Sequence, residues 1–448
     1  MPRVIRDTLV SAREMLITGG PFILLAVVLL AGAYYLLKPT PPKRVVLATG
    51  SEQGAYAAFG KRYQEELKRF GIEVVLRPSA GSRENQRLLQ DRKQDVQIAF
   101  VQGGASETRR TTASTTDEEE KLPVMSLGSI FYEPVWLFYR IEAAKKRSRD
   151  GIIADFSQLR GMGINAGAPG SGIPGIVNRM LIANRMDRED IRRSSLDLTP
   201  AVVELLAGKL DAVAMVSAPE SPLVQMLLQT PGIRLMEIEQ AEAYARRYRY
   251  LNPVVLPRGV VDLPKNVPPH DLPMLATTCS LVAREDLHPA LVQLFVQAAV
   301  RIHSGGGWIS KTGQFPTQLN TEFPLARDAE RFYRNGPPAM QRYLPFWLAN
   351  FVDRMWVALF SIIAILIPLS RVVPPLYQYR IRSRIYRWYR DLRQIEDAVG
   401  EKDANRAQLA SKLDDLDRKV ERVAVPLSYA DELYALRSAI GLVRKRLR

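Results

Sequence analysis

Residues 43–92 read KRVVLATGSEQGAYAAFGKRYQEELKRFGIEVVLRPSAGSRENQRLLQDR. An apolar run at residues 45–48 ends in a turn, and a helical pattern follows over residues 55–70. A second apolar run, at residues 72–77, also ends in a turn, and a second helix is expected to begin near Glu84. Strand, loop and helix in that order, twice, predict a parallel α/β sheet. Both loops lie at helix N-termini, where free backbone N–H groups and the helix dipole suit an anionic group.

Composition narrows the class of protein. The chain has 448 residues, 47% of them apolar and 24% charged, which fits more than one folded domain together with membrane segments. Cys279 is the only cysteine, so an intramolecular disulfide is excluded. The three histidines are scattered, and we expect neither a metal nor another cofactor. The net charge of +15 lies largely near apolar segments, so we do not expect nucleic-acid binding.

The first apolar segment, residues 15–37, contains no charged side chain. Roughly 20 apolar residues span a bilayer, so we predict a transmembrane helix here. The alternative is a signal peptide cleaved near Ala31, but the apolar run continues past that site to Leu37 and favours a retained anchor. Residues 1–14 carry three arginines and are expected in the cytoplasm, and residues 38–43 form a stiff linker.

A second span is predicted at residues 353–376. Its centre, residues 355–369, is uncharged but short, and a buried core helix is the alternative. The following stretch, residues 377–393, holds six arginines interleaved with aromatic and aliphatic side chains. By the positive-inside rule this stretch is cytoplasmic and lies on anionic lipid. With both termini inside, the region between the two spans lies outside the cytoplasm.

The last part of the chain, residues 377–448, is predicted to be a basic, helical, cytoplasmic tail. Apolar residues recur at spacings of three and four on both sides of Pro426. Ser428 and Asp431 resemble an N-terminal capping box. A helical hairpin or two short coiled-coil segments are expected.

Three motifs carry a resemblance to a known family. ATGSEQGAYAAFG begins at Ala48, PSAGSRENQRLL follows from Pro78, and GAPGSG occupies residues 167–172. In this order they resemble the TAXI family, the solute-binding proteins associated with TRAP transporters. In that family a GSxxGxY loop, a GSxEN loop and a GxPGSG loop line a ligand cleft. The resemblance covers about residues 44–300 and extends more loosely to residue 347.

The resemblance implies an α/β fold with two lobes, of the type II periplasmic-binding-protein layout, flanked by the two transmembrane helices. The first lobe would comprise residues 44–133 and 252–347, and the second lobe residues 134–251. Residues 105–120 are expected to form a flexible surface loop. A ligand held between hinged lobes is the functional consequence.

The same resemblance and the loop positions identify candidate ligand-binding residues. Their hydroxyl, amide, backbone and charged groups would hydrogen-bond a small polar ligand. Arg83 would pair with an acidic ligand, although pairing with Glu84 or a surface role explains it equally. Helix capping and turn formation explain part of the set without a ligand. The candidates are Thr49, Gly50, Ser51, Tyr56, Ser82, Arg83, Asn85, Gln102, Gly167, Pro169, Gly170 and Ser171.

The family implies a receptor in the bacterial inner membrane that delivers a small organic acid, such as a dicarboxylate or a glutamate-like compound, to a TRAP permease. Three sites depart from the family pattern: Glu52-Gln53, Ala57 and Gly103-Gly104. The alternative is a transmembrane sensor or scaffold that couples the binding domain to the helical tail, and a third possibility is an assembly protein that has lost binding. Catalysis is not expected, because Ser171 is not in a nucleophile elbow and residues 305–307 lack a phosphate-loop ending.

Overall fold

The computed structural model describes residues 3–104, 123–337, 339–399, 405–421 and 429–447. The chain divides into two compact units, one of Pro41–Phe346 and one of Met1–Thr40 with Trp347–Arg448. The predicted surface loop at residues 105–120 and the predicted capping box at Ser428 fall outside the described residues.

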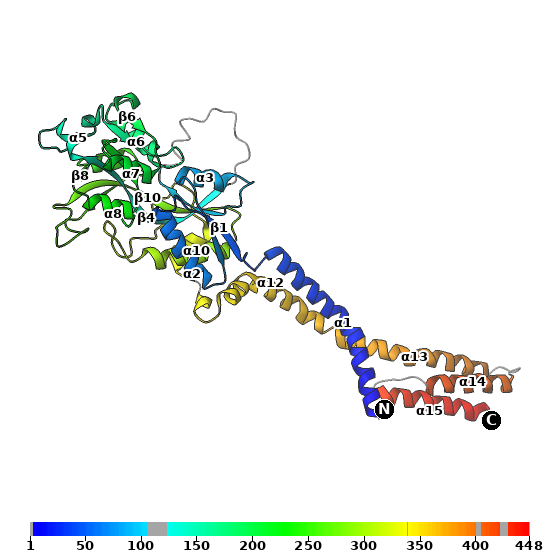
Figure 1. Ribbon diagram of the computed structural model, residues 1–448. Coiled ribbons are helices and arrows are strands. Elements are labelled where there is room, and N and C mark those ends of the chain that lie inside the picture. Colours follow the sequence, from blue (N-terminus) through cyan, green and yellow to red (C-terminus); the bar gives the residue numbers. More distant parts are fainter. Residues whose placement is uncertain (1–2, 105–122, 338, 400–404, 422–428, 448) are drawn as a thin grey trace. The chain divides into compact units, whose positions relative to one another are not determined.

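The unit Pro41–Phe346 is built on one mixed sheet with the strand order β2-β1-β3-β10-β4-β7-β5-β6 (Figure 1). β8 pairs with β4, and β9 pairs with β10. The strands are β1 (Arg44–Ala48), β2 (Glu73–Arg77), β3 (Ile98–Gln102), β4 (Val124–Arg140), β5 (Gly163–Asn165), β6 (Arg192–Ser194), β7 (Ala212–Val216), β8 (Ile233–Leu235), β9 (Asn252–Leu256) and β10 (Leu272–Arg284). The helices of this unit are α2 (Ala55–Lys68), α3 (Ser82–Gln90), α5 (Ile141–Lys145), α6 (Ile173–Ala183), α7 (Leu198–Leu206), α8 (Pro222–Gln229), α9 (Ala241–Arg247), α10 (Pro289–His303) and α11 (Arg327–Asn335).

The local sequence explains the first βαβ unit. The apolar run of β1 is buried throughout after Arg44, as expected of an interior parallel strand covered on both faces. In α2 the residues Ala55, Phe59, Tyr63 and Leu67 recur every four positions and are all buried, so one face of the helix packs on the sheet. The predicted strand–loop–helix repeat is therefore present in β1-α2-β2-α3.

Two long antiparallel strands, β4 and β10, run through both lobes. Residues 124–134 of β4 pair with β10, whereas residues 135–139 pair with β7. Residues 272–276 of β10 pair with β9, and residues 279–283 pair with β3. The sheet of one lobe therefore continues into the sheet of the other through these two strands.

One predicted lobe boundary is wrong. We expected the chain to return to the first lobe at Asn252, but β9 packs in the core of the second lobe. Val254 and Leu256 lie in one apolar cluster with Trp136 and Met215. The return takes place along β10 instead, because that strand carries the backbone from its β9 pairing to its β3 pairing.

The unit Met1–Thr40 with Trp347–Arg448 is helical in its described residues. It contains α1 (Arg3–Leu37), α12 (Phe346–Ser370), α13 (Val373–Val399), α14 (Arg406–Glu421) and α15 (Ala430–Leu447). Two helical stretches, Ile17–Leu37 and Phe346–Val399, are long and apolar enough to cross a membrane. Large apolar side chains such as Leu24 and Phe360 are exposed on them. The predicted single span at residues 353–376 is interrupted, because α12 ends at Ser370 and α13 begins at Val373.

The tail differs from the predicted hairpin in having a third partner. Ile385 and Leu392 of α13 lie in one apolar core with Leu413 of α14 and Leu436 and Ile440 of α15. The helices lie side by side (Figure 1). The basic, aromatic stretch that we expected on lipid therefore also has an apolar face packed on the tail.

Arg284 provides a test of the first-lobe packing. This residue at the end of β10 is buried, and its guanidinium donates hydrogen bonds to the carbonyls of Leu88 and Leu89 in the last turn of α3 and to those of Asp91 and Gln94 just after the helix. Replacing it by Met leaves these carbonyls unpaired, so we expect a loss of about 2–3 kcal/mol in the free energy of unfolding of this unit.

The measurement is the melting temperature of the detergent-solubilised full chain, followed by circular dichroism. Arg284→Lys, which retains the charge and part of the hydrogen bonding, should melt between wild type and Arg284→Met. Arg249→Met, at an exposed position, is the matched control and should melt like wild type. An Arg284→Met variant as stable as the control would contradict the assignment.

Candidate functional site

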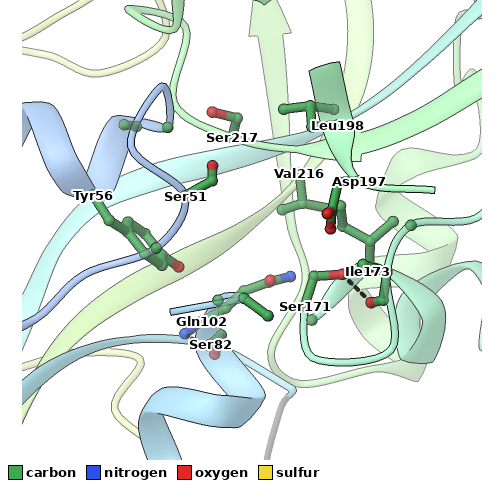
Figure 2. A pocket seen from close by; sticks show the side chains of 18 of the residues that line it. Ser51, Tyr56, Ser82, Gln102, Ser171, Ile173, Asp197, Leu198, Val216 and Ser217 are labelled. Carbon is green, nitrogen blue, oxygen red and sulfur yellow. Dashed lines mark hydrogen bonds between the residues drawn. The ribbon is translucent and has the colours of Figure 1, made fainter. Parts of the chain in front are cut away.

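A cavity of about 450 Å³ lies between the two lobes (Figure 2). The first lobe contributes the loops after β1 and β2 and the ends of α2 and β3, together with Glu133 on β4. The second lobe contributes the loops after β5 and β6 and the end of β7. The lining of the cavity includes Ser51, Tyr56, Ser82, Gln102, Asn165, Ser171, Ile173, Asp197, Thr199 and Ser217.

Four helices, α2, α3, α6 and α7, begin at this cavity. Their N-cap residues are Gly54, Gly81, Gly172 and Asp197, and none of these side chains caps its helix. All four residues line the cavity. The first backbone N–H groups of a helix lack an intrahelical acceptor, and the helix dipole places partial positive charge there. Pro174 in α6 and Pro200 in α7 have no N–H to offer, and the Glu84 N–H of α3 is donated to the Gly170 carbonyl, so the remaining first-turn N–H groups are the candidate donors. The arrangement therefore suits an anionic group.

Gln102 is the last residue of β3 and is only 4% exposed. Its backbone N–H donates to the hydroxyl of Ser82 at 2.7 Å. Its side-chain Nε2 is buried and has no hydrogen-bond partner within the described part of the chain. A buried donor without an acceptor is costly, so a ligand acceptor in this cavity would relieve that cost. A Cβ added at Gly172 would meet the Gln102 amide, so a larger residue there would require the Gln102 side chain to shift.

Glu133 on β4 is a cavity-lining residue that the sequence reading missed. Its side chain is 2% exposed and accepts a hydrogen bond of 3.0 Å from the Tyr56 hydroxyl. Burial raises the pKa of Glu133 to about 8, and the Tyr56 hydrogen bond only partly offsets that effect. The carboxyl group is therefore largely protonated at neutral pH. The available signal was a single carboxylate inside the apolar run FYEPVWLFY, residues 131–139.

The lobes touch each other around the cavity. The backbone N–H of Glu84 donates to the Gly170 carbonyl at 3.3 Å, and the Thr199 hydroxyl donates to the Gln53 side chain at 2.8 Å. A Cβ added at Gly170 would lie 2.5 Å from the Cβ of Ala80. The structure thus has the lobes closed on each other.

The structure brings part of the predicted set to the cavity. The predicted residues that line it are Gly50, Ser51, Tyr56, Ser82, Gln102, Gly167 and Ser171. The predicted residues that do not line it are Thr49, Arg83, Asn85, Pro169 and Gly170.

Asn85 lies behind the lining as a structural link. It is fully buried, and its Nδ2 donates to the carbonyls of Thr49 at 2.6 Å and Phe100 at 2.9 Å. Its Oδ1 accepts from the Ser79 hydroxyl at 2.7 Å. These bonds join the ends of β1 and β3 to the loop after β2, so the amide has no donor left for a ligand.

Arg83 is also absent from the lining. Burial, together with the nearby cations Arg87 and Arg179, lowers its pKa from the usual value. Among the described residues, the cavity lining contains no Lys, Arg or His. An anion in the cavity would therefore be held by neutral donors and helix N-termini rather than by the predicted arginine.

The described residues contain no group of three His, Cys, Asp or Glu placed to hold a metal ion. Cys279 is free and buried beside Tyr56, and burial raises the pKa of its thiol well above the usual value. The thiol is therefore protonated near neutral pH.

These features define a mixed α/β fold with a cavity beside the two long strands β4 and β10. The model of the NMT1-like family matches residues 47–335, and the chain belongs to that family. A comparison with curated proteins found no match.

Solved structures with a related fold are distant. The periplasmic aliphatic sulphonate binding protein SsuA from Escherichia coli is 12% identical, with 72% of this chain and 83% of that chain covered and a TM-score of 0.36. A protein from Bordetella bronchiseptica RB50 is 16% identical, with 58% of this chain and 70% of that chain covered and a TM-score of 0.40. A structure described as a periplasmic transporter is 10% identical, with 68% of this chain and 99% of that chain covered and a TM-score of 0.40.

The structural position of Asn85 generates a prediction. Asn85→Ala should lower the free energy of unfolding of the two-lobed unit by about 1–3 kcal/mol, because the buried carbonyls of Thr49 and Phe100 each lose a donor, whereas the Ser79 hydroxyl keeps its bond to Thr49. The melting temperature of the full chain in detergent measures this. Asn85→Asp retains the acceptor for Ser79 but loses both donors, so it should also be destabilised. Normal stability of Asn85→Ala would be incompatible with the structural role.

Proposed function

We propose that this protein is a membrane-anchored, extracytoplasmic solute receptor of the TAXI type that captures a small organic acid between its two lobes. The ligand would be a dicarboxylate or a glutamate-like compound, and the recipient a TRAP-type permease. The observation that carries the proposal is the closed interlobe cavity, into which four uncapped helix N-termini open. The family membership supports a binding role rather than catalysis.

Closure of the lobes is the proposed binding mechanism. A ligand that contacts both lobes binds the closed state better than the open state, so it shifts the population toward closure. The tight approach of Gly170 to Ala80 lets the two lobes meet beside the cavity. The continuous strands β4 and β10 are the only two that carry pairings of both lobes among the described strands, so they would bend at the hinge.

The proposed anchors are the apolar stretch of α1 and the apolar stretch of α12. Their exposed apolar side chains support insertion into a bilayer, and the arginines on both flanking cytoplasmic segments support the orientation. The two-lobed unit would then lie in the periplasm of a bacterium, with both termini in the cytoplasm.

A second candidate function is a transmembrane sensor or scaffold. The observation that favours it is the apolar core shared by α13, α14 and α15, because a simple anchor does not require a folded helical module after the second span. Under this alternative the cavity would still bind a ligand, and the helical module would contact a cytoplasmic partner.

Ligand capture is tested by calorimetric titration of the full chain in detergent with acetate, succinate, glutamate and methanesulfonate. We expect saturable binding of at least one anion. Gly170→Val should weaken it by about tenfold or more, because the added methyl groups collide with Ala80 and oppose closure. Gly305→Val is the matched control, since a Cβ there meets no atom within 4 Å, and it should bind like wild type. Folded protein that binds none of these anions would refute the proposal.

Orientation is tested by cysteine labelling. The native Cys279 is buried and should not react. A cysteine at exposed Lys311 should react with a membrane-impermeant maleimide in intact spheroplasts, whereas one at exposed Tyr434 should react only after lysis. The reverse pattern would contradict the proposed orientation.

A further inference from the structure

Three buried polar groups lie on neighbouring strands at the centre of the sheet. Gln102 ends β3, Glu133 is on β4, and Thr277 stands directly opposite Glu133 on β10. β10 lies between β3 and β4 in the sheet. Gln102 Nε2 and Thr277 Oγ1 have no hydrogen-bond partner among the residues that the structure describes, and Gln102 and Glu133 both line the interlobe cavity.

One of the two oxygens of the Glu133 carboxyl group accepts a hydrogen bond. Oε2 accepts from Tyr56, and this is the only hydrogen bond to that side chain in the described part of the chain. A neutral carboxyl group can accept at one oxygen and donate from the other. Glu133 could therefore donate from Oε1 while Tyr56 fixes the orientation of the group.

In the described ranges, no cation balances an ionised form of Glu133, and the cavity lining has no basic residue. The titratable groups that act on one another here are Tyr56 of α2 and Cys279 of β10, and burial raises the pKa of both well above their usual values. Both are thus neutral near pH 7. Asp197, at the start of α7, is the other acidic residue in the lining, and it is exposed to solvent. A charged Glu133 would repel an anion in this cavity.

We propose that Glu133 is the specificity residue of this site: its neutral carboxyl group donates a hydrogen bond to the acidic group of the ligand, so that the anion binds only while Glu133 retains its proton. This inference rests on the receptor function proposed above and names the chemistry of the ligand group as a carboxylate or another oxyanion. Gln102 Nε2 and the helix N-termini are the companion donors.

An amine ligand would produce the opposite pH dependence. An ammonium group beside Glu133 would favour the carboxylate, and its affinity would increase as the pH rises through the pKa of Glu133. An anion requires the protonated form, so its affinity decreases over the same range. The pKa of Glu133, raised by burial to about 8, places this change between pH 7 and pH 9.

The experiment is calorimetric titration of the detergent-solubilised full chain with acetate, succinate and methanesulfonate at pH 7 and pH 9. All three probes are fully ionised at both values. With a pKa of about 8, the protonated fraction of Glu133 falls about tenfold between these values, and affinity should fall by the same factor. In buffers of different ionisation enthalpy at pH 9, binding should take up close to one proton.

Glu133→Gln separates this role from a purely structural one. The amide retains a donor without a titrating proton, so affinity at pH 7 should stay within about threefold of wild type and the decrease at pH 9 should disappear. Glu239→Gln, at an exposed position outside the cavity lining, is the matched control and should retain the tenfold decrease. If Glu133→Gln does not fold, the proton uptake of the wild-type protein carries the test.

The titrations distinguish a failure of the receptor function from a failure of the role proposed for Glu133. If no probe binds the folded chain at either pH, the receptor function fails and this inference fails with it. If a probe binds equally at pH 7 and pH 9, binds more tightly at pH 9, or shows no proton uptake, the role of Glu133 is refuted while the receptor function stands.

Discussion

The backbone pairing of β4 with β10 is the constraint on which the two-lobed unit depends. Each of these strands leaves one lobe and enters the other without interruption, and they are hydrogen-bonded to each other from Val124 to Pro134 of β4. The two lobes therefore share a covalent and hydrogen-bonded connection at the floor of the cavity. Because Glu133 lies on this connection, the carboxyl group that lines the cavity is placed by the same strands that would bend when the lobes move.

The electrostatics of the cavity follow from its backbone rather than from charged side chains. Four helices begin there, and the described lining has no basic residue. Partial charges at helix N-termini are fixed and already oriented, so they cost little reorganisation when an anion binds. Burial keeps Glu133 neutral and so removes a repulsion that the sequence alone would lead one to expect. A weakly charged cavity of this kind is suited to reversible capture and release.

The loops of the candidate site could be predicted from the sequence, whereas the residues at its floor could not. The loops after β1, β2 and β5 have local signatures, in which glycine and hydroxyl residues follow a short apolar run, and this pattern placed Ser51, Ser82 and Ser171. Glu133 lies inside a strand, and only the pairing of β4 with its neighbouring strands determines which residues surround it. Asn85 was predicted as a ligand contact from a motif, yet its amide joins β1 to β3, because a motif does not show which way a side chain points.

Tertiary contacts that a local motif does not reveal also explain why β9 and α13 differ from the predictions. β9 reads as an ordinary apolar strand, and only its pairing with β10 assigns it to the second lobe. The apolar face of α13 is short and interrupted by arginines, so its packing with α14 and α15 depends on tertiary contacts that periodicity does not reveal. The TAXI assignment, the permease partner and the organic-acid ligand stay predictions, since family membership fixes none of them.

Hydrogen–deuterium exchange of the full chain with and without saturating succinate tests the central claim most directly. An anion held between the lobes should slow exchange together in the peptides that contain the first turns of α2, α3, α6 and α7, two from each lobe. Protection confined to the helices of one lobe, or found only outside these four helix starts, would contradict the account.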